Sequence, residues 1–224
     1  GEYMDKRKLR DLFIDKNLGK IMFDEPMKNH TSFKIGGPAD VIIIPENEEQ
    51  LINTVKICRD NNIETYIMGN GTNLLVRDGG IRGLVIKICE GLNTIKVDKE
   101  KIYCQAGSLI TAVSRKAMEE SLTGFEFANG IPGTIGGAAT MNAGAYGGEM
   151  KDVVVSVRAL DMDNRIVEYK NEDMNFRYRS SRVVDENLIV LSIEIELQAG
   201  IYTEINSTMK DLTNKRTSKQ PLEL

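Results

Sequence analysis

The sequence is poor in the side chains that bind metals or form disulfides. Its 224 residues include three cysteines and one histidine. Cys58, Cys89 and Cys104 are odd in number, lie far apart and form no C-x-x-C pair, which argues against a disulfide framework and against a zinc site. We therefore expect buried, reduced thiols in a cytoplasmic protein, and no bound metal.

Long apolar runs and an excess of positive charge are also absent from the sequence. No stretch of about 18 apolar residues occurs, so we expect no transmembrane helix, and the first residues lack the pattern of a secretory signal. Acidic residues outnumber basic ones, 33 to 29, which gives a formal net charge of −4. Without a basic stripe, we expect neither a nucleic acid nor a membrane as partner.

Hydrophobic patterning predicts a small α/β subdomain over residues 1–90. Apolar runs typical of buried strands alternate with a helical pattern, an order that favours an α/β fold. Asn47 can cap the second helix, with Gln50 at capping-box spacing. The predicted elements are strands at residues 40–45, 63–68 and 84–88, and helices at residues 5–18 and 48–61.

The following region, residues 91–200, has the pattern of a mostly antiparallel subdomain. Paired apolar runs around polar turns predict hairpins, and Ser108 is placed to cap a helix in which Leu109 faces inward. Alternation over residues 188–197 predicts a strand with one buried face. The predicted elements are hairpins at residues 94–105 and 153–169, a strand at 188–197, and helices at 108–121 and 202–216.

Two glycine-rich segments carry most of the functional signal. The first, residues 68–76, follows a predicted strand, but Leu74 stands where a Rossmann fingerprint needs its third glycine, and the next residues predict strand and turn rather than helix. No Walker A sequence is present either. Two interpretations remain for this segment: a structural turn, or a nest of backbone amides that binds a pyrophosphate.

The second glycine-rich segment, residues 129–149, contains seven glycines. Glycine is costly in regular structure, so this density indicates a backbone that approaches something closely. Pro132 limits the segment's freedom, and Gly136 and Gly137, followed by two alanines, allow a helix to begin with little bulk. Free N–H groups there could face an anion. Close packing of helix on sheet would require the same small residues, and the two interpretations are compatible.

Four motifs in order resemble the UDP-N-acetylenolpyruvoylglucosamine reductase family: NHTSFKIGGPAD at residues 29–40, GNGTNLLVRD at 69–78, the segment 130–149, and FRYRSSR at 176–182. The resemblance covers residues 20–224. It implies an α+β fold of the vanillyl-alcohol-oxidase (PCMH) type, in which two subdomains bind FAD. The implied enzyme is a cytoplasmic monomer that uses NADPH to reduce a UDP-sugar enolpyruvyl ether, UDP-N-acetylglucosamine enolpyruvate, to UDP-N-acetylmuramate for peptidoglycan synthesis.

The resemblance also implies which residues act. Arg179 would be catalytic, because its guanidinium can grip the enolpyruvyl carboxylate, and Tyr178 and Arg216 would also contact the substrate. His30 is interpreted as local structure or as support for the flavin site, and neither Ser180 nor Ser181 matches the family's catalytic serine. The implied FAD-binding residues are Gly69, Asn70, Gly71, Thr72, Asn73 and Leu74 in the first segment, and Ile131, Pro132, Gly133, Thr134, Gly136, Gly137, Ala138, Asn142, Gly144 and Ala145 in the second.

In the family, a third domain follows and supplies a proton-donating serine, in a Pro-Ser-Ala-Gly-Ser motif, and a later glutamate. Residues 201–224 are expected to begin that domain, and a chain that lacks the rest is expected to be inactive. Two other interpretations stay open at this stage. One is a different flavin oxidase of the same fold, with flavin attached through His or Cys, and the other is a flavin-binding module without enzyme activity.

Overall fold

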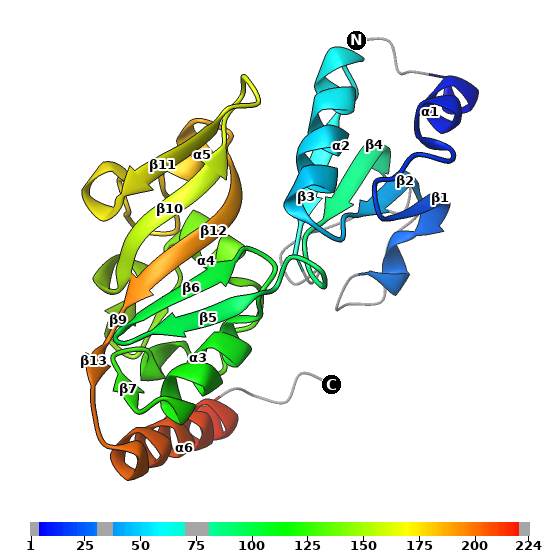
Figure 1. Cartoon of the computed structure of the whole chain (residues 1–224). Helices are drawn as coiled ribbons and strands as arrows, with labels where there is room; N and C mark the ends of the chain where they lie inside the picture. The colour runs from blue at the N-terminus through cyan, green and yellow to red at the C-terminus, as the bar shows by residue number, and fades with distance from the viewer. Residues whose placement is uncertain (1–4, 31–37, 70–80, 220–224) are drawn as a thin grey trace. The chain divides into compact units, whose positions relative to one another are not determined.

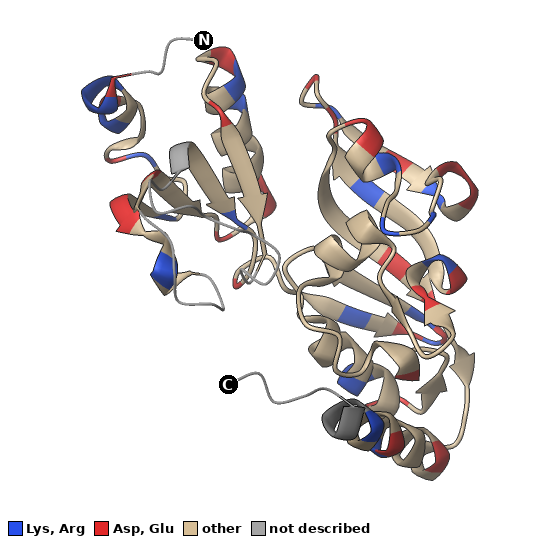
Figure 2. Ribbon diagram, turned by 180° about the vertical axis from the view of Figure 1, so that it is seen from behind, with Lys and Arg blue, Asp and Glu red and all other residues tan. Residues whose placement is uncertain are grey.

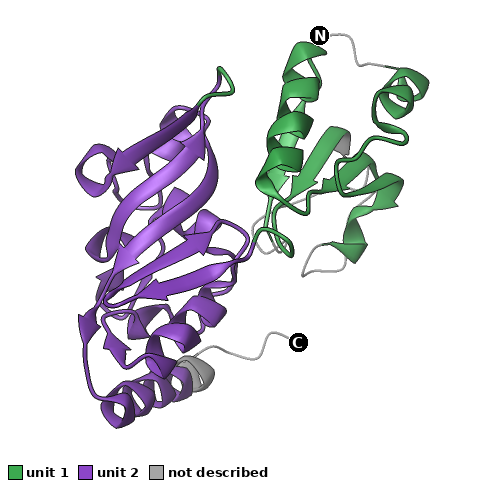
Figure 3. Ribbon diagram, in the orientation of Figure 1, with its two compact units in different colours: residues 1–92, 163–165 green, residues 93–162, 166–224 purple. Residues whose placement is uncertain are grey.

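The computed structural model describes residues 5–30, 38–69 and 81–219, and of residues 81, 82 and 216–219 it describes the backbone only. The chain divides into two compact units (Figures 1 and 3). Unit 1 comprises Gly1–Leu92 and Asp163–Arg165, and unit 2 comprises Asn93–Met162 and Ile166–Leu224. Within the described ranges, none of the helices combines the length and apolar character needed to cross a membrane.

Unit 1 is built on a four-stranded sheet with the order β1-β2-β4-β3. The strands β2 (Pro38–Ile44), β4 (Ile81–Lys87) and β3 (Thr65–Met68) are parallel, and β1 (Lys20–Pro26) joins antiparallel at one edge. Helix α2 (Glu48–Asp60) connects β2 to β3. The strand–helix–strand order is as predicted. The sequence pattern missed β1, because most of its residues are half-buried and none is fully buried.

Both faces of this sheet are covered by other parts of unit 1. Successive residues of a strand point to opposite faces, and Val41, Ile42 and Ile43 of β2 are all fully buried. Ile42 belongs to a cluster of buried side chains that includes Met68 and Val85. The unbroken apolar run in β2 therefore indicates a parallel strand buried on both sides, as the sequence suggested.

Helices α1 and α2 of unit 1 both begin at side-chain caps. Asn47 Oδ1 accepts a hydrogen bond from Gln50 N at 2.9 Å at the start of α2, which confirms the predicted cap. Helix α1 (Lys6–Phe13) buries Leu9 and Phe13, but it is shorter than the predicted span of residues 5–18. It ends there because the next residue takes an extended backbone conformation, with ψ 136°.

Unit 2 is built on a five-stranded antiparallel sheet with the order β11-β10-β12-β6-β5. The hairpins β5–β6 and β10–β11 are the two that the sequence predicts. Strand β12 lies between them and joins them into one sheet. The strands are β5 (Ile95–Asp98), β6 (Lys101–Gln105), β10 (Val154–Leu160), β11 (Ile166–Lys170) and β12 (Ile189–Glu196).

The central strand β12 is more deeply buried than its alternating sequence predicts. Leu191 and Ile193 are buried as expected, but Val190 and Ser192 between them are buried too. Helix α4 (Ile135–Met141) packs against this strand, and a strand in the middle of a covered sheet has no solvent face. The prediction of a single buried face is therefore wrong for the first five residues of β12.

Helix α3 (Ile110–Glu119) begins one residue later than the predicted cap at Ser108 implies, and Ser108 does not cap it. Leu109 occupies the cap position, with no side-chain hydrogen bond, and the hydroxyl of Ser108 donates instead to Thr94 O at 3.5 Å. Leu109, predicted to face inward, is 45% exposed. A residue in the cap position lies outside the helical repeat, so the periodic pattern does not apply to it.

The last helix, α6 (Tyr202–Lys219), packs against α3 and groups with unit 2, whereas the sequence analysis placed residues 201–224 at the start of another domain. Figure 2 shows Lys and Arg interspersed with Asp and Glu over the ribbons of both units. The remaining short elements are α5 (Arg182–Asp185), β7 (Leu122–Thr123) paired with β13 (Gln198–Ala199), β8 (Gly144–Ala145) paired with β9 (Gly148–Glu149), and the 3₁₀ turns η1 (Met27–Asn29), η2 (Glu126–Ala128), η3 (Met150–Asp152) and η4 (Asn171–Asp173).

Candidate functional site

The second glycine-rich segment forms a turn, helix α4 and the β8–β9 ribbon, all in unit 2. Gly130 and Gly133 have φ angles of 88° and 111°, which glycine adopts without the strain that a side chain would bring. Thr134 follows and caps α4, because its Oγ1 accepts from Gly137 N at 3.4 Å. The two glycines before the cap are therefore explained by backbone conformation.

The leading amides of α4 already have partners inside the protein. Ile135 N donates to Ser108 O at 2.7 Å, and Gly136 N donates to Ala106 O at 2.9 Å. Gly137 N donates to the capping threonine. The interpretation that free N–H groups at this helix start would face an anion is therefore wrong for these three amides.

Close packing explains Gly136, which is buried where α4 meets the end of β6. A Cβ atom at this position would lie 2.9 Å from Ala106 Cβ and 3.1 Å from Ala106 O. The neighbouring Gly137 is exposed, and a Cβ atom there would meet nothing closer than Thr134 Oγ1 at 3.5 Å. The protein's own packing therefore requires glycine at 136 but not at 137.

Asn142 connects the glycine-rich segment to the FRYRSSR motif. It ends α4 in the left-handed conformation, with φ 47° and ψ 52°. Its side-chain Nδ2 donates to Arg177 O at 3.2 Å, and its Oδ1 accepts from Lys151 N at 2.9 Å. Because this buried amide is used at both ends, Asn142 acts here as a link between two motifs that lie 35 residues apart.

The FRYRSSR motif forms a tight turn with Tyr178 and Arg179 at its tip, which we call the Tyr178/Arg179 turn. Arg177 N donates to Ser180 O at 3.1 Å, and Ser180 N donates to Arg177 O at 3.2 Å. Arg179 has a φ of 50°, and its Cζ lies 5.6 Å from the centre of the Tyr178 ring. Tyr178 is 86% exposed, so both residues are presented to solvent.

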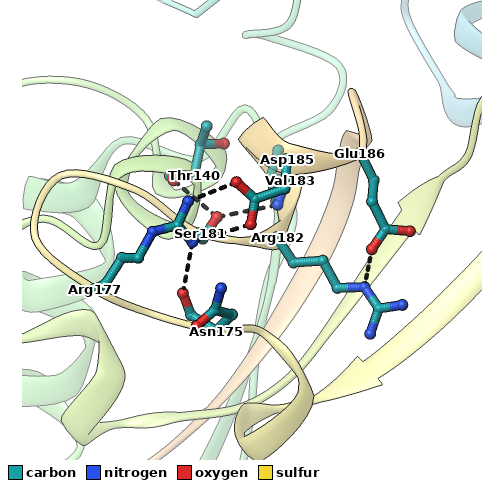
Figure 4. A network of polar contacts seen from close by, with 8 residues as sticks. All are labelled: Thr140, Asn175, Arg177, Ser181, Arg182, Val183, Asp185 and Glu186. Carbon is teal, nitrogen blue, oxygen red and sulfur yellow. Dashed lines mark hydrogen bonds and ion pairs between the residues drawn. The ribbon is translucent and has the colours of Figure 1, made fainter.

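An ion pair anchors the base of this turn to α5 (Figure 4). The guanidinium of Arg177 donates to both carboxylate oxygens of Asp185, at 3.0 and 2.5 Å, and to Asn175 O at 3.1 Å. The hydrogen bonds from Arg177 lower the pKa of Asp185, so the carboxylate is charged at neutral pH. Sequence reasoning missed this pair, because nothing in the pattern marks Arg177 and Asp185 as neighbours.

Ser181 has a structural role rather than a chemical one. Its side chain is buried, and its Oγ accepts from Val183 N at 3.2 Å, which caps α5. The same hydroxyl donates to Thr140 O at 2.8 Å (Figure 4). Thus α4 is joined to the FRYRSSR motif at two points, through Asn142 and through Ser181.

In unit 1, His30 lies in a short chain of polar side chains. Its Nε2 lies 3.1 Å from Glu25 Oε1, and its Nδ1 lies 3.3 Å from Lys87 Nζ. An ammonium group can only donate, so Nδ1 accepts and Nε2 carries the proton that is donated to Glu25. Both ring nitrogens of His30 therefore have a polar partner within unit 1, which supports its interpretation as local support.

The cysteines do not supply reactive groups. Cys58 and Cys104 are buried and Cys89 is half-buried, and burial raises the pKa of Cys58 to about 11 and of Cys104 to about 12. The thiolate is the nucleophile and metal ligand, so these two thiols are inert at neutral pH. In the parts of the chain that the structure describes, no group of three or more His, Cys, Asp or Glu side chains could hold a metal ion.

The other predicted site residues divide between what the structure describes and what it does not. Gly69 directly follows β3, at the edge where Met68 pairs with Lys87 of β4. Residues 70–74 lie outside the described residues, as does the side chain of Arg216 in α6. In unit 2, Pro132, Gly137 and Gly144 are exposed, Ile131, Gly133 and Ala145 are half-buried, and Thr134, Gly136 and Ala138 are buried.

Comparison with known proteins identifies what these elements belong to. A family model described as an FAD binding domain matches residues 39–170. A crystal structure of UDP-N-acetylenolpyruvylglucosamine reductase from Thermus caldophilus superposes with a TM-score of 0.76 at 29% identity, over 90% of this chain and 70% of that one. A cholesterol oxidase from Brevibacterium sterolicum shares the fold alone, with a TM-score of 0.62 at 13% identity, over 89% of this chain and 40% of that one.

The fold and the domain match define an FAD-binding protein, and they confirm the predicted α+β flavoprotein fold. UDP-N-acetylenolpyruvoylglucosamine reductases from Clostridioides difficile (strain 630) and Alkaliphilus metalliredigens (strain QYMF) are 50% and 47% identical to this chain, over 90% and 99% of its length. The chain belongs to the UDP-N-acetylenolpyruvoylglucosamine reductase family. It spans 66% and 73% of the length of these two relatives.

Proposed function

We propose that the protein is an FAD-dependent reductase that converts UDP-N-acetylglucosamine enolpyruvate to UDP-N-acetylmuramate with NADPH, for peptidoglycan synthesis. We place it in the cytoplasm, as a monomer that acts on small molecules. The observation that carries this proposal is the link from the glycine-rich segment, through Asn142, to an exposed arginine at the tip of the Tyr178/Arg179 turn. The names and the identity of the relatives support the reaction.

The residues present in unit 2 fit a flavin. Gly137 is exposed, and the nearest contact of a Cβ atom there would be Thr134 Oγ1 at 3.5 Å, so packing leaves its small size unexplained. Pro132 and Gly144 are also exposed. We propose that this strip of the second segment, with residues 69–74 in unit 1, would hold FAD. When bound, FAD supplies the group that accepts and donates hydride.

Arg179 would hold the carboxylate of the enolpyruvyl group. Its guanidinium stays charged at any working pH, and its planar fork matches a carboxylate. Negative charge develops next to that carboxylate when the double bond is reduced, so the arginine stabilises the transition state more than the ground state. Tyr178 is interpreted as a wall of the substrate site, because its ring lies beside the guanidinium.

The test is Arg179→Ala in the FAD-loaded enzyme at the full length of the family, third domain included, with each half-reaction followed by stopped-flow absorbance. Reoxidation of reduced flavin by the enolpyruvyl substrate should slow by about 10²–10³, the loss typical of one electrostatic stabiliser. Reduction by NADPH should slow far less, and FAD affinity should be unchanged. Arg179→Lys should restore only part of the rate, because lysine keeps the charge but loses the fork. If both half-reactions slowed equally, the role assigned to Arg179 would be wrong.

A further inference from the structure

The ion pair between Arg177 and Asp185 has no part in the chemistry proposed above. Its geometry is bidentate, with Arg177 Nη1 and Nη2 donating to separate oxygens of Asp185 at 3.0 and 2.5 Å, and such pairs fix orientation as well as attract. The two side chains are 43% and 39% exposed, and exposed pairs contribute little to stability. The main effect of this ion pair is therefore to fix the position of the Arg177 side chain.

Arg177 is held by its backbone as well as by its side chain. Its N–H and its carbonyl close the Tyr178/Arg179 turn through Ser180. The same carbonyl accepts a second hydrogen bond from Asn142 Nδ2 at 3.2 Å. Arg177 is thus the point where the turn, α4 and α5 meet, and it lies two residues before Arg179.

We propose that Asp185 is a positioning residue for Arg179: by gripping Arg177, it fixes the direction in which the turn presents the arginine to an anionic substrate group. This inference rests on the role proposed for Arg179. Without Asp185, the turn keeps its own two backbone hydrogen bonds, so it stays folded. It loses its side-chain connection to α5, so the guanidinium of Arg179 samples a wider range of positions.

A matched control lies at the C-terminal end of the same short helix. Glu186, the next residue after Asp185, forms an ion pair with Arg182 in the i,i+4 arrangement, with exposure similar to that of the first pair. Arg182 Cζ lies 3.9 Å from the centre of the Tyr169 ring in β11, so this second pair is directed at the sheet rather than at the turn. Glu186→Gln removes one charge from the neighbouring position and leaves Arg177 untouched.

The experiment compares Asp185→Asn with Glu186→Gln in the FAD-loaded enzyme at the full length of the family, with and without Arg179→Ala. Reoxidation of reduced flavin is measured over a range of UDP-N-acetylglucosamine enolpyruvate concentrations. We expect Asp185→Asn alone to lower the second-order rate constant by about 10- to 100-fold, the effect of a misplaced catalytic group, and Glu186→Gln to leave it unchanged. In the Arg179→Ala background, Asp185→Asn should add nothing, because residues that act through one another are not additive.

The outcomes separate this inference from the function on which it rests. If Arg179→Ala itself leaves reoxidation unchanged, the proposed function of Arg179 fails. If Arg179→Ala slows reoxidation but Asp185→Asn behaves like Glu186→Gln, or slows the reaction equally in both backgrounds, the positioning role is wrong. Should Asp185→Asn fail to load FAD, Arg177→Lys tests the same link, since lysine keeps the charge but cannot form the bidentate pair.

Discussion

Arg179 combines an exposed side chain with a backbone conformation that suits glycine. Its φ of 50° lies in the left-handed region, which costs an ordinary residue about 1–2 kcal/mol. Glycine or asparagine is the usual residue at such a turn position. Residues in strained conformations cluster at functional sites. An arginine at this position, despite the conformational cost, is therefore consistent with a side chain that binds a ligand.

We therefore expect Arg179→Gly to be more stable than Arg179→Ala, by about 0.5–1 kcal/mol after the greater chain entropy of glycine is subtracted. Both variants remove the guanidinium, so they differ only in the Cβ atom at a left-handed backbone. Urea unfolding of the two flavin-free proteins measures the difference. The control is Tyr178, whose φ is not positive: there glycine should be the less stable of the two. If Arg179→Gly proved less stable than Arg179→Ala, the backbone at residue 179 would not be strained.

In helix α4, two adjacent positions are occupied by glycine for different reasons. A Cβ atom at Gly136 would press on Ala106, at 2.9 Å from its Cβ, whereas one at Gly137 would have room. Overpacking of a tight site costs about 1–3 kcal/mol, and alanine is a better helix former than glycine by up to about 1 kcal/mol. The sequence shows only two adjacent glycines, whereas the structure shows that packing requires glycine at 136 and not at 137.

Gly136→Ala should consequently destabilise the flavin-free protein, by about 1–2 kcal/mol once the helix-propensity gain is subtracted. Gly137→Ala should leave its stability unchanged or raise it. Thermal unfolding of the two variants beside the unmodified protein gives the comparison, and each variant serves as the control for the other. The packing explanation would be refuted by equal stability of the two variants.

The elements that sequence reasoning predicted well are those whose pattern reflects local structure. The cap at Asn47, the span of α2 and both hairpins of unit 2 depend on residues close in the chain. The errors arose from distant partners. Both faces of β12 are buried because α4 packs on it, and Ser108 bonds to Thr94 rather than to its helix. Neither contact leaves a periodic mark in the sequence.

The same division applies to the candidate site. The glycine-rich segment could be identified from residue types, and the FRYRSSR motif from its resemblance to the family. Their connection through Asn142 and Ser181 could not, because it spans 35 and 41 residues. The ion pair between Asp185 and Arg177 also depends on where α5 places its side chains. The sequence therefore identified the segments of the candidate site but not the contacts that hold them together.

At the scale of the whole molecule, we expect FAD to bind tightly but without a covalent bond. Covalent attachment in this fold uses histidine or cysteine, and the structure offers poor candidates. Both ring nitrogens of His30 are hydrogen-bonded, and Cys58 and Cys104 are buried. FAD at about 100 times its dissociation constant should raise the free energy of unfolding by about 2.7 kcal/mol.

Two measurements on one sample check this expectation. Chemical denaturation with and without FAD gives the stabilisation, and absorbance of the supernatant after acid precipitation gives the released flavin. Yellow colour that stays with the precipitated protein would support the alternative of a covalent flavin oxidase. Flavin that binds reversibly but is not reduced by NADPH would favour a flavin-binding module without enzyme activity.

The hydrogen bonds at the start of α4 bear on how the protein is made. Ile135 N and Gly136 N are satisfied by Ser108 O and Ala106 O, so the helix does not need a ligand to neutralise its first turn. A newly synthesised chain can therefore complete this part of unit 2 before any cofactor arrives. Flavin loading can then follow on an α4 that is already in place, and the flavin-free protein would keep this part of its fold.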